Sequence, residues 1–323
     1  MTIYAHIAFR KAFSPAFAPL CTCNIVTTAL TLPSRPLIII VMGKNGLILE
    51  GGALRGLFTM GILDVFLEEG IVFDGAAGVS AGVAFGCNYK SEQKGRAIRY
   101  NKRFNKEWRF KGWRSLITTG DLFGVEFCYD KIPNELDVFD RESFKNNRMD
   151  FWAVVSDCES GEAVYHKLSD GGDEDMLWIR ASASMPLASR PVVINGRRYL
   201  DGGLADSIPL EFMQKQGFDR NVVILTQPAD YVKHAYPKAA AAALRKIPKA
   251  AELVRNRHIM YNAQTAYVKS EADKGNTLIL CPASPLNIKP LERDPERMQH
   301  VYDEGRMLAL LRADEIKAFL AQA

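Results

Sequence analysis

The stretch Gly75–Gly82, which reads GAAGVSAG, decides the predicted fold. Small and apolar residues over 72–79 predict a short buried strand, and a helix is expected to begin at Ala81. Residues 78–82 form the pattern G-x-S-x-G, which is typical of a nucleophile elbow. Such a turn is tight, so its two glycines avoid Cβ collisions and the Ser80 hydroxyl is lifted clear of the backbone. The helix that follows directs its free N–H groups towards any negative charge that forms at Ser80.

A glycine-rich turn precedes this strand by one helix. The short apolar strand 47–49 is closed by Glu50, and the turn after it, residues 51–56, reads GGALRG. Apolar residues at helical spacing then predict a helix over 57–67 that stops at Gly70. Strand, turn, helix and strand make a βαβ unit with a parallel sheet and both turns at its carboxyl edge. Because the connection rule places these turns side by side, we expect the amides of residues 51–56 to approach Ser80.

The glycine turn admits two interpretations. A dinucleotide-binding loop would need G-x-G-x-x-G and an acid at the end of the next strand, but Ala53 takes the third position and Asp74 precedes the apolar run. A Walker-type phosphate loop is excluded because the chain has no G-K-[ST] there. The alternative is an oxyanion hole, in which the N–H groups near Gly52 and Ala53, with that of Ala81, bind an oxygen that becomes negative during acyl transfer. Arg55 would steady the loop or meet an anionic head group. We favour the oxyanion hole because only this interpretation accounts for both turns.

Length and composition fit a protein with a full core. The 323 residues are 48% hydrophobic, and the net charge of +4 is only mildly basic. No run of Lys and Arg is interleaved with aromatic residues, so nucleic acid is not an expected partner. The six cysteines are scattered, which is typical of a reduced cytosolic protein, and Cys21-x-Cys23 lacks the spacing of a zinc site. We therefore expect a cytoplasmic protein without a metal.

Residues 1–45 differ from the rest of the chain. They contain no Asp or Glu, and the first acid is Glu50. A transit or signal peptide would have this charge bias, but Pro15 and Pro19 break the apolar stretch and no clean cleavage site follows. A transmembrane helix would need an apolar run of about 18 residues, which is missing. We favour a poorly ordered extension, with the working protein starting near Met42.

The remaining chain predicts alternating strands and helices. Strands are expected over 151–156, 163–165, 222–225 and 277–280, and helices over 173–182, 210–213, 237–270, 294–309 and 312–322. Residues 89–150 are polar and aromatic, and they are either helices packed on the sheet or a mobile cover over an apolar acyl pocket. The stretch 237–270 is alanine-rich and basic, and it is either a solvated helical face or a surface that approaches anionic lipid.

The second candidate residue is Asp201. Residues 191–200 predict a hairpin around an Asn-Gly turn, and this hairpin delivers Asp201, Gly202 and Gly203. An Asp before two glycines is often only a turn former, but Ser80 needs a base. None of the five histidines lies in a recognisable active-site context, so a Ser–His–Asp triad is poorly supported. A Ser–Asp dyad needs only a carboxylate within hydrogen-bond reach of the hydroxyl, in a partly dry pocket.

Three motifs now stand in order at fitting separations. They are EGGALRG at 50–56, GVSAG at 78–82 and DGG at 201–203. In these motifs the chain resembles the patatin-like phospholipase family. The segments 155–161 and 179–186 are also similar to that family. The resemblance covers residues 46–230, and the tail looks like that of a bacterial branch.

The resemblance implies both a fold and an activity. The fold would be of the α/β class, a three-layer α/β/α sandwich with a mostly parallel central sheet. The activity would be a serine acyl hydrolase that cleaves lipid carboxylic esters through an acyl-enzyme, with a lipid or acyl ester as substrate and no cofactor. Ser80 would be the nucleophile and Asp201 the base. The supporting motif residues would be Gly51, Gly52, Ala53, Arg55, Gly56 and Ala81 at the oxyanion loop, with Gly78, Gly82, Gly202 and Gly203 beside the dyad. One departure is Ala53, where the family usually has a third glycine.

The expected organisation has three parts. Residues 1–45 form the extension, 46–230 the catalytic core, and 231–323 a helical part that completes the same domain. The expected partners are the lipid or acyl-ester substrate and an anionic membrane contacted peripherally. Two other functions stay open: a non-catalytic lipid- or acyl-binding protein on the same fold, and a nucleotide-binding regulator.

Overall fold

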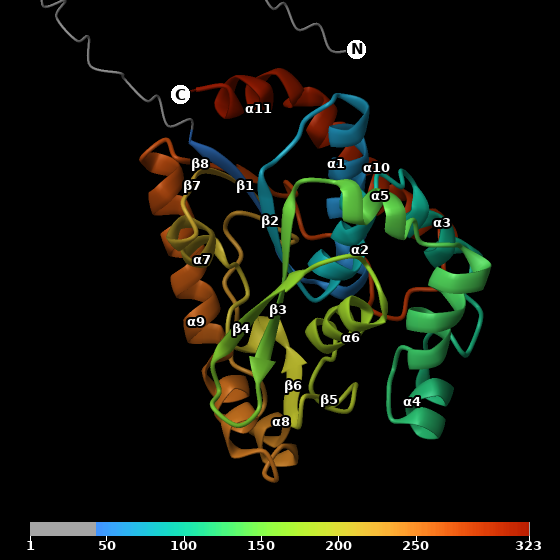
Figure 1. The fold of residues 1–323 in the computed structure, drawn as a ribbon. Coiled ribbons are helices and arrows are strands. Elements are labelled where there is room, and N and C mark those ends of the chain that lie inside the picture. Colours follow the sequence, from blue (N-terminus) through green and yellow to red (C-terminus); the bar gives the residue numbers. More distant parts are fainter. Residues whose placement is uncertain (1–42, 323) are drawn as a thin grey trace, which may run out of the picture. The chain divides into compact units, whose positions relative to one another are not determined.

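The computed structural model describes residues 43–322, and its centre is a sheet with helices on both faces (Figure 1). The strands are β1 (Lys44–Leu49), β2 (Gly75–Val79), β3 (Asp150–Asp157), β4 (Ala163–Leu168), β5 (Val192–Ile194), β6 (Arg197–Asp201), β7 (Phe218–Ile224) and β8 (Thr277–Leu280). Their order is β5-β6-β3-β2-β1-β7-β8, and β4 pairs with β3. The run from β3 through β2, β1 and β7 to β8 is parallel, whereas β4, β5 and β6 pair antiparallel. This mostly parallel sheet between helices confirms the predicted three-layer α/β/α sandwich.

Two sets of helices cover the sheet. One face packs against α1 (Gly56–Glu68), α2 (Ala81–Lys90), α3 (Arg96–Arg103), α6 (Asp173–Ser182), α10 (Pro295–Leu311), α11 (Ala313–Leu320) and the π-helix η2 (Phe127–Leu136). The other face packs against α7 (Leu210–Lys215) and α9 (Pro248–Asp273). The short elements are η1 (Ala53–Arg55), α4 (Trp113–Thr119), α5 (Arg141–Asn146), η3 (Gly202–Leu204) and α8 (Lys238–Ala243).

The position of strand β1 in the sheet explains why residues 47–49 form an unbroken apolar run. Leu47 and Leu49 belong to the core under α1 and α2, whereas Ile48 belongs to the core under α7 and α9. Successive side chains of a strand point to opposite faces, so a strand covered on both sides is apolar at every position. All three side chains are buried.

The last helices belong to the same core as the first. A Cβ at Gly305 of α10 would overlap the Phe58 carbonyl oxygen of α1, and one at Gly61 would overlap the Tyr302 carbonyl oxygen. The two helices therefore cross in close contact through two glycines. The Tyr302 hydroxyl also donates a hydrogen bond of 2.6 Å to the buried Asp64 carboxyl. The described residues, 43–322, accordingly belong to one compact unit.

Most predicted elements are found, but several boundaries differ. The predicted helix 237–270 is divided into α8 and α9, with a break over residues 244–247, and the predicted strand 222–225 begins at Phe218. Helix α6 spans the predicted 173–182, and β5 and β6 join through Asn195 and Gly196, both at positive φ (49° and 77°), as the Asn-Gly signal predicted. The predicted strand 72–79 was wrong at its start. Pairing with β1 begins at Gly75, and Val72 is 74% exposed. The expectations for residues 1–42, including the extension and Cys21-x-Cys23, lie outside the described residues.

Two other expectations concern the redox state of the cysteines and the presence of a membrane-spanning helix. Cys87, Cys128, Cys158 and Cys281 are all free thiols, as their scattered positions predicted. None of the helices within residues 43–322 combines the length and the apolar character needed to cross a membrane.

The glycine contact between α1 and α10 gives a first prediction. Gly305→Ala should lower the free energy of unfolding by about 1–3 kcal/mol, because the added methyl forces the two helices apart. Chemical denaturation monitored by circular dichroism measures the change. Met307→Ala, on the same helix but 65% exposed, serves as the control and should stay within about 0.5 kcal/mol of the parent. Equal stability of the Gly305→Ala variant and the parent would refute the close packing.

Candidate active site

Ser80 lies at the sharp turn between β2 and α2. Its backbone has φ 54° and ψ −121°, an unfavourable conformation for a residue with a Cβ, and the residue is 7% exposed. A Cβ at Gly82 would overlap the Leu49 carbonyl oxygen, and one at Gly78 would lie 2.6 Å from the Val83 nitrogen. The two glycines of the motif therefore allow α2 to start directly behind the strand, pressed against β1.

A second serine, Ser182, fixes the turn that carries Ser80. The Ser80 amide donates a hydrogen bond of 2.9 Å to the Ser182 hydroxyl, which in turn donates one of 2.6 Å to the Val154 carbonyl oxygen on β3. This chain of hydrogen bonds ties the strained turn to the central strand and to the last residue of α6. Sequence reasoning assigned Ser182 no role, although it lies in the segment 179–186 that resembles the family.

Strand β3 brings Asp201 to Ser80. The edge of β3 that faces away from β4 pairs with β2 up to Val154, which lies opposite Val79, and with β6 from Val155, which lies opposite Asp201. Because β2 is parallel to β3 and β6 is antiparallel, the two strands approach each other end to end. Their carboxyl ends, which carry Ser80 and Asp201, therefore meet.

The backbone of Asp201 is held on both sides. Its amide donates to the Ser184 carbonyl oxygen at 2.9 Å, and its carbonyl oxygen accepts from the Ser156 hydroxyl at 2.8 Å. A Cβ at Gly202 would overlap the Val154 carbonyl oxygen, so the chain after Asp201 can pass this closely only as glycine. These contacts fix the direction of the Asp201 side chain.

The carboxyl of Asp201 is a buried acid with few partners. The residue is 5% exposed, and its Oδ1 accepts a hydrogen bond of 2.8 Å from the Gly203 amide. Burial is the largest influence on its pKa and raises it above the ordinary value of an aspartate. The nearby Arg257 guanidinium and the hydroxyl of Ser80 lower the pKa in part. A carboxylate whose pKa is raised is a better proton acceptor, which suits a general base.

The glycine turn lies against the elbow, as the connection rule predicted. A Cβ at Gly51 would lie 2.8 Å from the Ser80 Cβ, and one at Gly56 would lie 3.0 Å from the Ala81 Cβ. The amides of Gly52, Ala53 and Ala81 belong to the first turns of η1 and α2, where amides have no partner within the helix. Ala53 has φ 49°, a left-handed conformation that its methyl group disfavours.

Glu50 anchors this turn to the opposite face of the sheet. Its carboxyl accepts from the Thr226 amide at 2.6 Å and from the Tyr261 hydroxyl at 2.8 Å, and the residue is 4% exposed. The ends of β1 and β7 are thereby locked together and joined to α9. Sequence reasoning gave Glu50 only the role of closing the strand.

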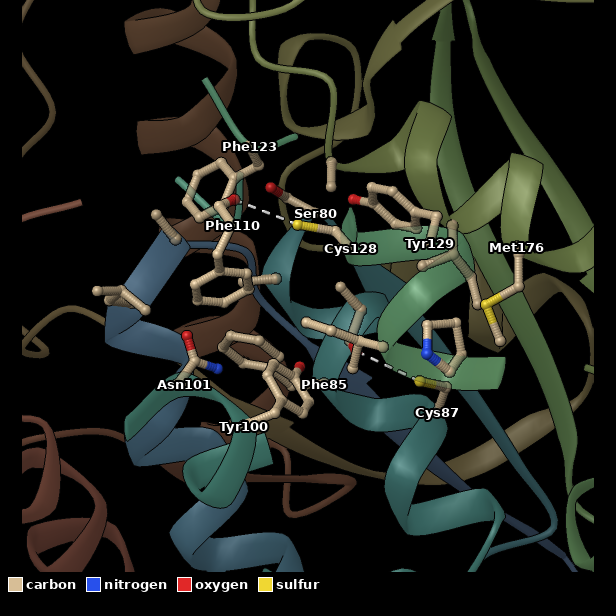
Figure 2. A pocket seen from close by; sticks show the side chains of 18 of the residues that line it. Ser80, Phe85, Cys87, Tyr100, Asn101, Phe110, Phe123, Cys128, Tyr129 and Met176 are labelled. Atoms are coloured by element: carbon tan, nitrogen blue, oxygen red, sulfur yellow. Dashed lines mark hydrogen bonds between the residues drawn. The ribbon is translucent and has the colours of Figure 1, made fainter. Parts of the chain in front are cut away.

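An apolar cavity of about 120 Å³ opens on one side of Ser80. Figure 2 shows Ser80 at one end of the cavity and the rings of Phe85, Tyr100 and Phe110 deeper inside. Its wall is completed by Phe123, Cys128, Tyr129 and Met176. The segment 89–150 therefore supplies much of this wall, besides packing on the sheet.

A polar cavity of about 420 Å³ opens on the other side of Ser80. Its charged lining residues are Glu50, Arg55, Asp201, Lys233 and Arg257. Ala53, Ser80 and Met185 line both cavities, so Ser80 lies at their junction. Sequence reasoning included Arg257 only in a basic helical stretch, since its contact with the Asp motif spans 54 residues of chain.

Three other kinds of site can be compared with the arrangement of residues 43–322: a histidine-containing triad, a metal site and a dinucleotide site. Neither cavity is lined by a histidine, and His166 instead stacks on the Trp178 ring at 4.2 Å. No group of three or more His, Cys, Asp or Glu side chains in the described part of the chain could hold a metal ion. Asp74, the acid that a dinucleotide loop would use, lies at the start of β2, where its carboxyl accepts from the Asn45 amide. These positions disfavour a triad and a dinucleotide site.

Comparisons with known proteins match this region. A family model described as "Patatin-like phospholipase" matches residues 47–213, and one for a domain of unknown function (DUF6363) matches 247–321. The uncharacterized protein YjjU of Escherichia coli is 27% identical over 276 residues, which cover 82% of this chain and 76% of YjjU. Lysophospholipase NTE1 of Kluyveromyces lactis is 30% identical over 180 residues, and that of Candida albicans 28% over 186.

These matches differ in extent. The fungal alignments cover 53% and 55% of this chain but only 12% and 13% of those much longer proteins. Among solved structures, VipD from Legionella pneumophila aligns with a TM-score of 0.42 and 12% identity, over 85% of this chain and 67% of VipD.

The conformation of Ala53 gives a second prediction. Ala53→Gly should raise the free energy of unfolding by about 1 kcal/mol, because glycine adopts φ 49° without the clash of a Cβ. Ala266→Gly is the matched control, because Ala266 is exposed within α9 and glycine there should lower stability by about 1 kcal/mol. Equal losses in both variants, measured by chemical denaturation, would contradict the left-handed conformation at residue 53.

Proposed function

The chain belongs to the patatin-like phospholipase family, and on that premise we propose that it hydrolyses carboxylic esters of lipids through Ser80 and Asp201. The observation that carries this proposal is the position of Ser80, which lies at the junction of an apolar and a polar cavity and beside the buried carboxyl of Asp201. An ester at that junction can place its acyl chain in the first cavity and its alcohol part in the second.

The chemistry requires two displacements at one carbonyl carbon. Asp201 accepts the hydroxyl proton while Ser80 Oγ attacks the carbonyl, and the C=O electrons move to oxygen. The amides of Gly52, Ala53 and Ala81 donate to this oxyanion, and removal of one such donor typically costs about 10²–10³-fold in rate. The intermediate collapses, the C–O bond of the ester breaks, and the alcohol leaves with the proton from Asp201. Water then attacks the acyl-serine by the same steps and releases the acid.

The cavity walls favour an acyl chain as the group attached to the carbonyl. Each methylene moved from water to an apolar wall gains about 0.8 kcal/mol. The side chains around Ser80 on this side are largely aromatic or aliphatic. The fungal relatives carry the name lysophospholipase, and this supports a lipid with a single acyl chain as the substrate class.

A non-catalytic lipid-binding protein is the second candidate. It would use the same apolar cavity, but it has no need of a serine at φ 54° or of a buried carboxyl beside it. A fluorophosphonate probe separates the two functions, since only an activated serine reacts with it. Labelling that requires Ser80 supports the hydrolase.

The third prediction concerns the dyad. Ser80→Ala should abolish hydrolysis of a p-nitrophenyl ester, and Asp201→Asn should lower kcat by several orders of magnitude, as for other catalytic carboxylates. Both variants should keep the thermal unfolding temperature of the parent or exceed it, because Asp201→Asn removes a buried charge with incomplete pairing. Parental turnover in a folded Ser80→Ala variant would overturn the assignment.

The fourth prediction concerns the acid limb of the pH profile. Hydrolysis needs Asp201 ionised, so kcat/KM should fall as the pH drops through its raised pKa. Arg257 lowers that pKa, so Arg257→Gln should move the acid limb to higher pH, measured with a neutral p-nitrophenyl ester. Arg255→Gln removes an exposed charge two residues earlier and should leave the limb in place. The same limb for Arg257→Gln and the parent would contradict Asp201 as the base.

A further inference from the structure

The apolar cavity beside Ser80 is open at one end and closed at the other. At the Ser80 end it is lined by Ala53 and Met185, which also line the polar cavity and are partly exposed. Its far end is lined by Cys87 and Tyr100, which are 4% and 9% exposed. Figure 2 shows these two side chains in the lower part of the view, with Ser80 above them. The cavity is therefore a pocket without an exit at its deep end.

The closed end is held in place by a buried ion pair. Arg96, at the start of α3, lines the cavity and is 4% exposed. Its guanidinium lies 3.3 Å from the Asp137 carboxylate, and it also donates to the Asp137 carbonyl oxygen at 3.0 Å and to Asn88 Oδ1 at 2.8 Å. The same guanidinium lies 5.4 Å from the centre of the Tyr100 ring. Because a buried charge that loses its partner is strongly destabilising, Arg96 and Tyr100 form a fixed floor.

Helix α2 gives the depth of the pocket. Ser80 immediately precedes this helix, and Ala84 and Cys87, which follow it by one and two turns, line the same cavity. Since a helix rises 1.5 Å per residue, the level of Cys87 lies about 10 Å beyond that of Ser80 along the helix axis. An extended chain advances about 1.2 Å per bond, so roughly eight carbons span this depth.

The volume of the cavity gives a second and smaller estimate of the chain length. The cavity measures about 120 Å³. An apolar cavity of about 150 Å³ in another protein holds one benzene molecule, which has six carbons, and on that scale this cavity holds about five. The depth and the volume together allow an acyl chain of about five to eight carbons.

We propose that Arg96 and Tyr100 limit the length of the acyl chain, so that the enzyme prefers esters of acids with about five to eight carbons. Burial of each further methylene should raise kcat/KM about fourfold until the terminal methyl group meets the floor. A longer chain would have to displace a paired guanidinium or leave part of its length in water. The inference rests on the proposed ester hydrolysis, and it names the acyl part of the substrate.

Hydrolysis of a series of p-nitrophenyl esters tests the limit directly. The series runs from acetate through butyrate, hexanoate, octanoate and decanoate to dodecanoate, all in one neutral detergent. For the parent, kcat/KM should be highest for hexanoate or octanoate and about tenfold lower, or less, for dodecanoate. A maximum at any other ester, or a flat profile, would overturn the proposal.

Variants of the two helices that line the pocket test the residues. Tyr100→Ala removes a ring from the floor and should move the maximum to decanoate or dodecanoate. Ala84→Leu fills the pocket one turn beyond Ser80 and should move the maximum to acetate or butyrate. An unchanged maximum in either variant, once it is shown to be folded, would contradict the limit on chain length.

Ile98→Ala is the matched control for these variants. Ile98 is buried on the same helix as Tyr100 but does not line the cavity. The control should therefore lower the thermal unfolding temperature and keep the parental maximum. A maximum that moves in Ile98→Ala as it does in Tyr100→Ala would assign the effect to loosened packing, and the proposal would be wrong.

The Ser80→Ala variant separates this inference from the proposed function. Sodium alkanoates bind without turnover, and in calorimetric titration of this variant the affinity should rise about fourfold per methylene up to octanoate and level off beyond it. If the variant keeps parental hydrolysis of the esters, the proposed function is wrong, whatever the titration shows. If it loses hydrolysis but its affinity keeps rising to dodecanoate, the hydrolase stands and the limit on chain length is wrong.

Discussion

The geometry of the candidate site depends on strand β3, because two different strands, β2 and β6, pair with the same edge of it. One of its edges pairs first with β2 and then, one residue later, with β6, which runs in the opposite direction. Two strands that meet end to end bring their last residues together, so Ser80 and Asp201 become neighbours although 120 residues of chain separate them. The Ser182 hydroxyl strengthens this junction, because it bridges the Ser80 amide and the Val154 carbonyl oxygen at the point where one partner strand gives way to the other.

The parts that sequence could predict are those encoded locally. Helical spacing, the apolar runs and the Asn-Gly hairpin identified the βαβ unit, helix 173–182 and the strand that ends at Asp201. The start of β2 was missed because Val72 has the right composition for a strand but has no partner there and is exposed. The local sequence indicates which secondary structure a residue favours. The ends of a strand also depend on where the neighbouring strand begins, which the local sequence does not contain.

The parts that sequence could not predict are contacts between distant segments. Arg257 appeared only as a member of the basic stretch 237–270, where a solvated helical face is the usual interpretation, and Lys233 was not singled out. The position of Arg257 beside the Asp motif depends on the packing of α9, which lets its side chain reach the Gly203 carbonyl oxygen. Glu50 likewise looked like the end of a strand, and its partner Tyr261 lies 211 residues away. Motif reasoning therefore identified the two candidate residues more readily than the charged groups that surround them.

Three features of the candidate site are energetically unfavourable, and each of them would serve the proposed reaction. Ser80 and Ala53 have backbone angles that their Cβ atoms disfavour, and Asp201 keeps a carboxyl in a buried position with one amide as its hydrogen-bond donor. The first angle belongs to the sharp turn that carries the Ser80 hydroxyl, the second belongs to the glycine turn beside it, and burial raises the pKa of the Asp201 carboxyl. Such strain persists only where the surroundings impose it, and here the two glycine contacts of Gly82 and Gly202 press both loops onto the sheet. The strained turns and the buried acid lower the stability of the fold, and the packing around them has to offset that cost.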